Sequence, residues 1–330
     1  MQRLNKVFGA TAVLVLTVAL GTASASYRDT VEKRFSVQPG GTFVLTADFG
    51  SIEVRTHSAN AVDIKIFRKV DTGSKRRAKE ILEGLDIQYD QRGNTVEMEV
   101  HYPDSWEERF RRDRLHLRFR ITVPREFNVD LKTGGGSIAV DDLKGEVRGR
   151  TSGGGLTFGR IEGPIYGRTS GGAIRLESCT GNAEVRTSGG SIHIGDVTGN
   201  VIARTSGGGI TILRTGGEVE AETSGGNIRV EDARGAVDAS TSGGSIRVTL
   251  SAQPQRDCRF RTSGGSIYVY LPEDVRVSVD ASTGSGHVET DFPIILKGRI
   301  DERAFRAKIN GGGPLLRLRT TGGNIYLRKL

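Results

Sequence analysis

Short hydrophobic runs alternate with polar residues along most of the chain, and the alternation repeats with a fixed period. Within residues 200–212, Val201, Ala203 and Thr205 alternate with Ile202 and Arg204, so the two sets point to opposite faces of a strand. The motif Thr-Ser-Gly-Gly recurs every 18 residues, with a last interval of 21, and begins at Thr151, Thr169, Thr187, Thr205, Thr223, Thr241 and Thr262. A fixed short period of this kind indicates stacked coils rather than a globule.

Each coil offers the same inward-facing positions on both sides of its glycines. Four residues before the motif threonine stand Val147, Ile165, Ala183, Val201, Val219, Val237 and Cys258, and after the glycines stand Leu156, Ile174, Ile192, Ile210, Ile228, Ile246 and Ile267. Glycine suits the corners between strands because it lets successive backbones stack closely. The sequence therefore predicts an all-β fold, a single-stranded parallel β-helix or β-solenoid with 18-residue coils. Its narrow interior is expected to be filled, so a ligand would bind outside.

The two ends of the repeat are less regular. Residues 26–132 form a β-rich region with irregular coils, in which residues 74–85 are the one convincing helix, with Ala78, Ile81 and Leu82 on one stripe. Such a helix is expected to cover an open end or flank of the coils. Residues 133–330 form the regular solenoid. In it, residues 292–309 break the period before residues 315–327 resume it, which predicts modified coils at the C-terminal end.

The first 25 residues have the three parts of a secretory signal peptide. Arg3 and Lys6 precede an apolar run from Val7 to Leu20, and cleavage is expected after Ala25. Removing the two basic residues lowers the formal net charge from +8 to +6. We expect an exported chain, periplasmic or at the cell surface, without a transmembrane anchor after cleavage. A moderate basic excess is compatible with anionic envelope polymers.

An exported protein lies where disulfides form, so the two cysteines require a test against the repeat. Cys179 and Cys258 fall four coils apart. At about 4.8 Å per strand this separation is roughly 19 Å, which is too long for a disulfide. Both occupy inward positions that hold aliphatic residues in other coils. We expect two buried free thiols.

Several motifs together resemble one bacterial family. They are the opening Gly-Gly-Thr-Phe-Val-Leu strand, the segment from Gly50 to Val54, the Thr-Ser-Gly-Gly-x-Ile coils and the closing Thr-Gly-Gly-Asn-Ile-Tyr-Leu. The chain resembles the exported β-strand-repeat proteins named putative adhesins, a domain of unknown function. The resemblance covers nearly all of the mature chain and implies a cell-envelope protein with a β-helical body. It carries no catalytic or binding residues to transfer.

The first candidate binding site is a strip of arginines at outward positions just before the motif threonine. Its members are Arg150, Arg168, Arg186 and Arg204. Guanidinium groups stacked at the strand spacing could hold carboxylates or phosphates in bidentate pairs. Neighbouring acids such as Glu184 and Glu220 offer the alternative of internal ion pairs on a solvated surface.

Two further candidates combine aromatic and basic residues. Residues 103–114 include Trp106, Arg109, Arg111 and Arg112, a mixture that could bind a glycan, a lipid headgroup or a single-stranded nucleic acid. The alternative is a protruding loop with the tryptophan against the body. Tyr268 and Tyr326 lie at outward positions of late coils and suit sugar stacking, protein contact or simple cross-strand packing.

Catalytic chemistry has little support in the sequence. The five histidines are scattered without metal-ligand spacing, so we expect no metal and no cofactor. Polysaccharide-cleaving β-helix enzymes cluster carboxylates on neighbouring coils. The corresponding row here, Asp142, Arg160, Ser178, Asp196, Arg214 and Asp232, has no adjacent pair of acids.

The sequence therefore favours a non-enzymatic exported cell-envelope protein that presents an adhesin-like binding or scaffold surface. Two alternatives stay open: a polysaccharide-active β-helix enzyme, and an envelope accessory protein that binds anionic polymers through the arginine strip. The expected partner is an anionic envelope polymer, a glycan or an envelope protein, and not a specific nucleic acid. The irregular first and last coils argue against open polymerisation, so we expect a monomer.

Overall fold

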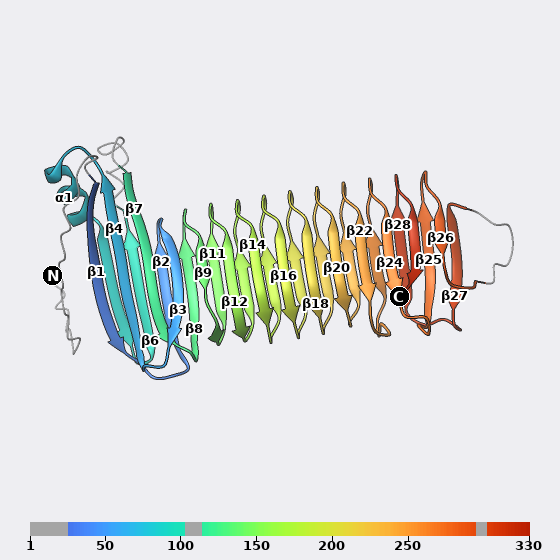
Figure 1. Ribbon diagram of the computed structural model, residues 1–330, viewed down its shortest axis with the longest axis horizontal. Helices are drawn as coiled ribbons and strands as arrows, with labels where there is room; N and C mark the ends of the chain where they lie inside the picture. The colour runs from blue at the N-terminus through green and yellow to red at the C-terminus, as the bar shows by residue number, and fades with distance from the viewer. Residues whose placement is uncertain (1–25, 103–113, 295–301) are drawn as a thin grey trace, which may run out of the picture. The chain divides into compact units, whose positions relative to one another are not determined.

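The computed structural model describes residues 26–102, 114–294 and 302–330. The chain forms two compact units, one ending at Gly154 and the other beginning at Gly155. Both consist almost wholly of short strands, and the single described helix is α1 (Figure 1). In the described part of the chain, no helix is long and apolar enough to cross a membrane.

The first unit contains eleven strands and the helix. Its elements are β1 (Ser26–Ser36), β2 (Gly41–Ala47), β3 (Ser51–His57), β4 (Ala61–Asp71), α1 (Lys75–Glu83), β5 (Asp86–Arg92), β6 (Thr95–His101), β7 (Arg114–Pro124), β8 (Phe127–Thr133), β9 (Ile138–Val140), β10 (Leu143–Lys144) and β11 (Val147–Thr151). One sheet has the order β1-β4-β7-β3-β9, and the other has the order β11-β8-β2-β6-β5. The coil of β2 and β3 therefore pairs with strands that come later in the chain on both of its sides.

The helix predicted at residues 74–85 is present as α1. Ser74 caps it, because the Ser74 side chain accepts a hydrogen bond from the Arg77 backbone N–H. Ala78 and Ile81 are buried against Val70 of β4. The apolar stripe read from the sequence therefore packs on the inward face of the first unit, beside strands that pair antiparallel at its edge.

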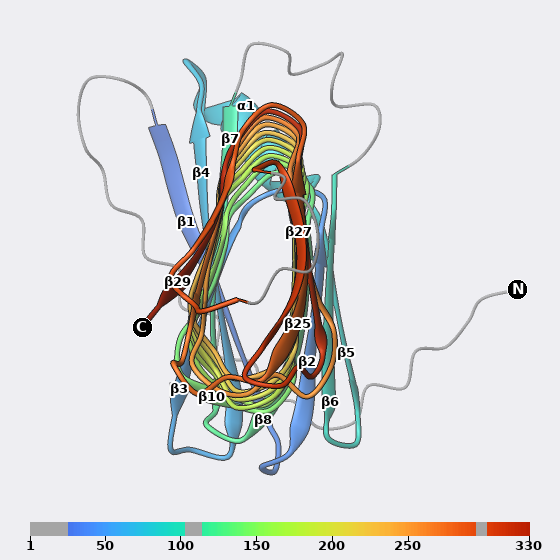
Figure 2. The same cartoon turned by 90° about the vertical axis from the view of Figure 1, so that its right-hand side faces the viewer.

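The second unit contains eighteen strands. They are β12 (Leu156–Glu162), β13 (Ile165–Arg168), β14 (Ile174–Cys179), β15 (Ala183–Arg186), β16 (Ile192–Val197), β17 (Val201–Arg204), β18 (Ile210–Thr215), β19 (Val219–Glu222), β20 (Ile228–Ala233), β21 (Val237–Ser240), β22 (Ile246–Leu250), β23 (Cys258–Arg261), β24 (Ile267–Leu271), β25 (Val277–Thr283), β26 (Val288–Thr290), β27 (Ala304–Ile309), β28 (Leu315–Thr320) and β29 (Ile325–Lys329). Viewed along the stack, the coils of this unit lie one behind another and enclose a narrow interior (Figure 2).

The regular coils pair in parallel and in register, as the period predicts. Ile192 of β16 lies beside Ile174 and Ile210, and Val201 of β17 lies beside Ala183 and Val219. All six of these side chains are buried. The β-solenoid fold is therefore confirmed, and its interior is an apolar seam filled by the inward rows.

The last two strands of the chain do not form the terminal coil. β28 pairs with β23 on one side and β25 on the other, and β29 lies between β24 and β26. The final coil is thus inserted into the stack, while β25 and its antiparallel partner β27 form the edge. Modified coils at this end were predicted from the sequence, whereas the insertion of the final coil between earlier strands was not.

A ladder of hydrogen bonds runs along the Thr-Ser-Gly-Gly corners. The buried hydroxyl of Thr205 donates to the Gly190 carbonyl at 2.8 Å, and Thr223 repeats the contact to Gly208 at 2.7 Å. Thr223 also accepts a hydrogen bond from the Gly226 backbone N–H of its own coil at 3.4 Å. The Thr223 hydroxyl is therefore satisfied as both donor and acceptor, which explains how a polar side chain can stand at an inward position.

Cys179 and Cys258 are both free and buried, as predicted. Burial raises the pKa of the Cys258 thiol to about 11, and it raises the pKa of Cys179 as well. Because the thiolate is the nucleophile, we expect neither cysteine of the folded protein to react with iodoacetamide at pH 8. Mass spectrometry should show two modified cysteines after denaturation and none before it. Rapid labelling of either one in the native protein would contradict this placement.

Candidate functional site

The predicted arginine strip is largely occupied by internal ion pairs. In the first unit, Arg150 lies 3.9 Å from Asp130. In the second, Arg186 contacts Glu184 at 2.9 Å, and Arg204 pairs with both Glu220 and Glu222. The hydrogen bond to Glu220 raises the pKa of the Arg204 guanidinium.

Arg168 differs from the other members of the strip. It is exposed and has no acidic partner among the described residues. The strip thus offers one uncommitted guanidinium in its middle rather than a continuous row of them.

A larger basic cluster lies on the outward face where the last coil is inserted. This C-terminal basic patch comprises Arg259 and Arg261 of β23, Arg317 and Arg319 of β28, and Arg306 and Lys308 of β27. The register sets Arg259 beside Arg317 and Arg261 beside Arg319. Sequence reasoning missed the patch because its members are up to 60 residues apart and meet only through the inserted coil.

Acidic residues balance only part of this patch. Asp280 of β25 binds Arg319 at 2.5 Å and Arg306 at 3.3 Å, and Arg259 lies 3.7 Å from Asp238. Burial alone would raise the pKa of Asp280, but the hydrogen bonds from Arg319 and Arg306 lower it overall.

The remaining basic groups of the patch are uncommitted. Arg261, Lys308 and Arg317 are exposed and have no acidic partner in residues 26–102, 114–294 and 302–330. The patch therefore keeps an excess of positive charge with three free cationic groups.

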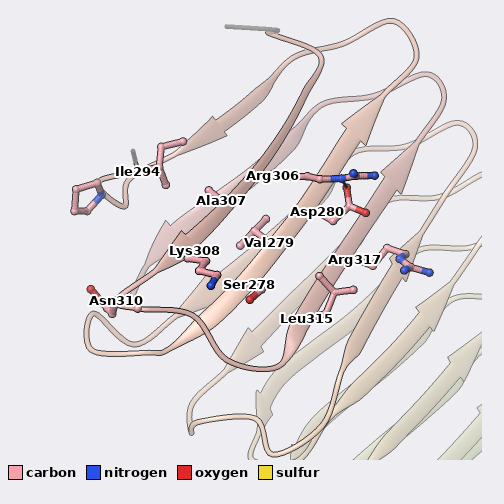
Figure 3. A pocket seen from close by; sticks show the side chains of 12 residues that line it. Ser278, Val279, Asp280, Ile294, Arg306, Ala307, Lys308, Asn310, Leu315 and Arg317 are labelled. Carbon is pink, nitrogen blue, oxygen red and sulfur yellow. Dashed lines mark hydrogen bonds and ion pairs between the residues drawn. The ribbon is translucent and has the colours of Figure 1, made fainter. Parts of the chain in front are cut away.

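An open hollow of about 1170 Å³ adjoins the patch (Figure 3). Its lining includes Ser278, Asp280, Arg306, Lys308, Leu315 and Arg317. Figure 3 shows Arg306 beside Asp280 and Lys308 beside Ser278. The hollow thus combines cationic groups, a hydroxyl and some apolar surface, which is a set that can receive an anionic group attached to a larger ligand.

The two predicted tyrosines do come together, on the outward face of the other sheet. Tyr268 and Tyr326 stack at a centroid distance of 4.8 Å and an angle of 13°. Arg247 lies over Tyr268 at 5.0 Å, and Arg328 lies over Tyr326 at the same distance. The edge of His287 also meets Tyr326 at 5.8 Å. Their ring faces are therefore covered by neighbours, an arrangement that favours cross-strand packing over sugar stacking.

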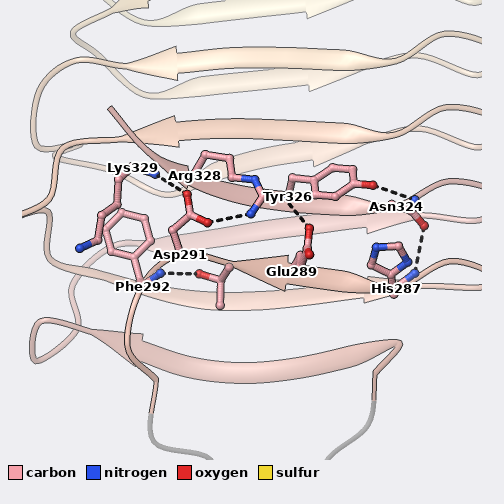
Figure 4. Close-up of polar contacts among 9 residues, drawn as sticks. His287, Glu289, Asp291, Phe292, Asn324, Tyr326, Arg328 and Lys329 are labelled. Atoms are coloured by element: carbon pink, nitrogen blue, oxygen red, sulfur yellow. Dashed lines mark hydrogen bonds and ion pairs between the residues drawn. The ribbon is translucent and has the colours of Figure 1, made fainter.

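Tyr326 belongs to a network that ties β26 to β29 (Figure 4). Asn324 donates a hydrogen bond to the Tyr326 hydroxyl at 2.9 Å. Arg328 binds Asp291 at 2.7 Å and Glu289 at 2.5 Å. This surface is internally satisfied, so its charged groups stabilise the inserted coil rather than await a ligand.

The acids of the row considered for catalysis also form ion pairs within the protein. Arg214 lies between two acids of the neighbouring coils, 3.5 Å from Asp196 and 4.0 Å from Asp232. Asp232 also accepts a hydrogen bond from Ser251. No group of three His, Cys, Asp or Glu side chains within the described residues could hold a metal ion.

The aromatic and basic segment around Trp106, Arg109, Arg111 and Arg112 lies outside the described residues, as does the predicted signal peptide. Both therefore stay predictions.

The described units thus define a parallel β-solenoid protein with charged outward rows and an apolar seam. The chain belongs to the Toastrack DUF4097 family, whose model matches residues 44–328. This agrees with the resemblance found from the sequence. No curated protein matches the chain.

Three solved structures align with most of the chain. A putative cell adhesion protein from Clostridium sporogenes is 11% identical, with 91% of this chain and 100% of that chain covered and a TM-score of 0.23. A putative adhesin from Bacteroides fragilis is 13% identical, with 91% and 97% covered and a TM-score of 0.29. A putative lipid binding protein from Parabacteroides distasonis is 13% identical, with 90% and 96% covered and a TM-score of 0.34. At TM-scores this low, we carry nothing over from these proteins to this chain.

Proposed function

We propose that the chain is a non-enzymatic exported protein of the bacterial cell envelope, whose β-solenoid binds an envelope component on its outward faces. The observation that carries this proposal is the contrast between the two faces of each coil. Inward rows are filled by buried apolar side chains, whereas outward rows present charged residues in register along the stack. Extended repeat surfaces of this kind suit adhesion and scaffold roles.

The arrangement of the acids supports binding over catalysis. A glycosidase needs one carboxyl group as acid and a second as base or nucleophile. Here Arg214 stands between Asp196 and Asp232 and pairs with both. Both carboxylates are therefore engaged in ion pairs with one guanidinium, rather than free to act on a sugar as an acid and a base.

A binding screen tests the proposal. The chain from Ser26 onward would be presented with neutral glycans, acidic glycans and isolated envelope fractions at low and physiological salt. We expect salt-sensitive binding to at least one acidic component, because the mature chain keeps a basic excess. We also expect no turnover of any glycan.

Two pairs of variants decide between the alternatives. Weakened binding in Arg168→Glu with Arg186→Glu, at unchanged melting temperature, would place the contact on the arginine strip. Glycan turnover that is lost in Asp196→Asn or Asp232→Asn would overturn the non-enzymatic proposal in favour of a polysaccharide-active enzyme.

A further inference from the structure

The C-terminal basic patch has the features of a surface built to receive anions. Two pairs of arginines lie directly opposite each other on β23 and β28, where neighbouring strands are only about 4.8 Å apart. Like charges opposite each other in a sheet are destabilising. In the regular coils, acids pair with Arg186 and Arg204, whereas Arg168 has no acidic partner among the described residues. In the patch, acids offset the repulsion between opposite arginines only in part.

Asp280 orients the arginines of the patch rather than neutralising the patch. Its carboxylate accepts hydrogen bonds from Arg319 and Arg306. Arg319 also donates to the backbone carbonyls of Asp280 and Leu318, at 2.7 and 2.9 Å. Arg319 is thus held down along the sheet. Arg261 lies opposite Arg319 on β23, and Arg317 precedes it by two residues on β28. Both keep their guanidinium groups free among the described residues. Rigid neighbours around free guanidinium groups lower the entropy cost of binding.

The loop after β27 places the third free cation. Gly312 has a φ of +84°, and a Cβ on it would lie 3.0 Å from Lys308 Cδ and 3.3 Å from Ser278 Oγ. The positive φ favours glycine at this position. The register of β25 and β27 sets Lys308 opposite Ser278, and both line the hollow, where the two can donate hydrogen bonds to the same anionic group.

The chemistry of the outward face selects the kind of polymer. Arginine pairs with carboxylate and phosphate oxygens through two parallel hydrogen bonds. Binding of single-stranded nucleic acid relies on aromatic side chains as stacking platforms. None of the outward residues of β23, β25, β27 and β28 is aromatic. An acidic polysaccharide, which needs ion pairs and hydroxyl contacts but no ring stacking, fits this face better.

We propose that the C-terminal basic patch binds an acidic polysaccharide, with Arg261, Arg317 and Lys308 contacting carboxylate or phosphate groups on successive sugars. This inference rests on the proposed function and assigns it a ligand class and a surface. It moves the anion contact from the strip around Arg168 to the end of the solenoid where the last coil is inserted.

The test compares two double variants of equal charge in the chain from Ser26 onward. Arg261→Gln with Arg317→Gln removes the free guanidinium groups of the patch. Arg175→Gln with Arg234→Gln removes two exposed arginines that have no acidic partner within the described residues and lie outside the patch. Polygalacturonate supplies carboxylates, a phosphate-bearing bacterial glycan supplies phosphates, dextran is the neutral control, and single-stranded DNA is the nucleic-acid arm.

We expect the unaltered protein to bind one or both acidic polymers at low salt and to ignore dextran. The patch variant should bind on the order of 10-fold more weakly and show a shallower dependence on salt, since fewer counterions are released. The control variant should stay within about twofold of the unaltered protein, because its charge loss is remote from the patch. Melting temperatures should agree among all three proteins, as the changed side chains are exposed.

Each other result overturns the inference in a distinguishable way. Equal losses in both variants would show an effect of net charge alone. Unchanged binding in the patch variant would leave the proposed function standing and remove the patch from it. Tighter binding of DNA, lost in the patch variant, would make the patch a nucleic-acid site. If the protein bound other envelope components but no acidic polymer, the inference would be refuted and the proposed function would stand. A wholly negative screen would refute the proposed function too.

Discussion

Replacing Gly208 by alanine is expected to destabilise the second unit by about 3 kcal/mol or more, the upper range for overpacking. A Cβ at this position would lie 2.3 Å from the Gly190 carbonyl oxygen of the preceding coil, which is far inside van der Waals contact. The backbone of one coil cannot move away without breaking the ladder, since Gly208 also accepts the hydrogen bond of Thr223. Urea unfolding with hydrogen exchange of the central coils measures the effect.

Gly207→Ala is the matched control. A Cβ there would lie 3.1 Å from the Gly189 carbonyl oxygen, a tight distance that a small shift relieves. The loss of conformational entropy in the unfolded chain is the same for both variants and cancels in the comparison. We expect Gly207→Ala to change stability by less than about 1 kcal/mol. Equal destabilisation by the two variants would contradict the close approach at the second glycine of the corner.

Removal of residues 314–330 is expected to unfold more of the chain than it deletes. Leu316, Leu318, Ile325 and Leu327 are fully buried. Each contributes about 1.5–3 kcal/mol through burial. The deletion also leaves β25 and β26 without their parallel partners, because β28 and β29 lie between them and the regular coils. Hydrogen exchange should show protection lost throughout β24 to β27 and kept in β12 to β20.

The deletion also tests the chain order of the stack. If β28 and β29 were the terminal coil, β25 and β26 would rest directly on β23 and β24, and their protection would survive the deletion. Removal of the exposed Leu330 alone is the control, and we expect it to leave all of these strands protected. Survival of β25 in the deletion variant would refute the inserted coil.

The regular coils were predictable because their causes are local. Alternation with a period of two assigned Val201 and Ala203 to the interior, and the glycine pairs marked the corners. The same reasoning placed Cys179 and Cys258 inside as free thiols, and the stripe of Ala78 and Ile81 revealed the helix. Each of these inferences needs only a residue and its neighbours within one coil.

The candidate site was harder to predict from the sequence, because the contacts of outward side chains depend on which coils are neighbours. The arginine strip was recognised, and the acids named as its alternative partners do pair with Arg186 and Arg204. The approach of Tyr326 to Tyr268 and of Arg317 to Arg259 depends on a coil that returns from the end of the chain. Nothing in the local pattern of either segment records that return.

The sequence by itself thus determined the coil, its inward rows, its corners and its free cysteines. Only the tertiary structure decided the order in which the last coils stack, and with it the C-terminal basic patch. The physical reason is the equivalence of the repeats. Each coil presents the same apolar rows and the same threonine hydroxyl to a neighbour, so Thr320 bonds to Gly265 with the geometry that Thr262 has with Gly244. Such interfaces specify that coils stack, but they do not specify which coil lies on which.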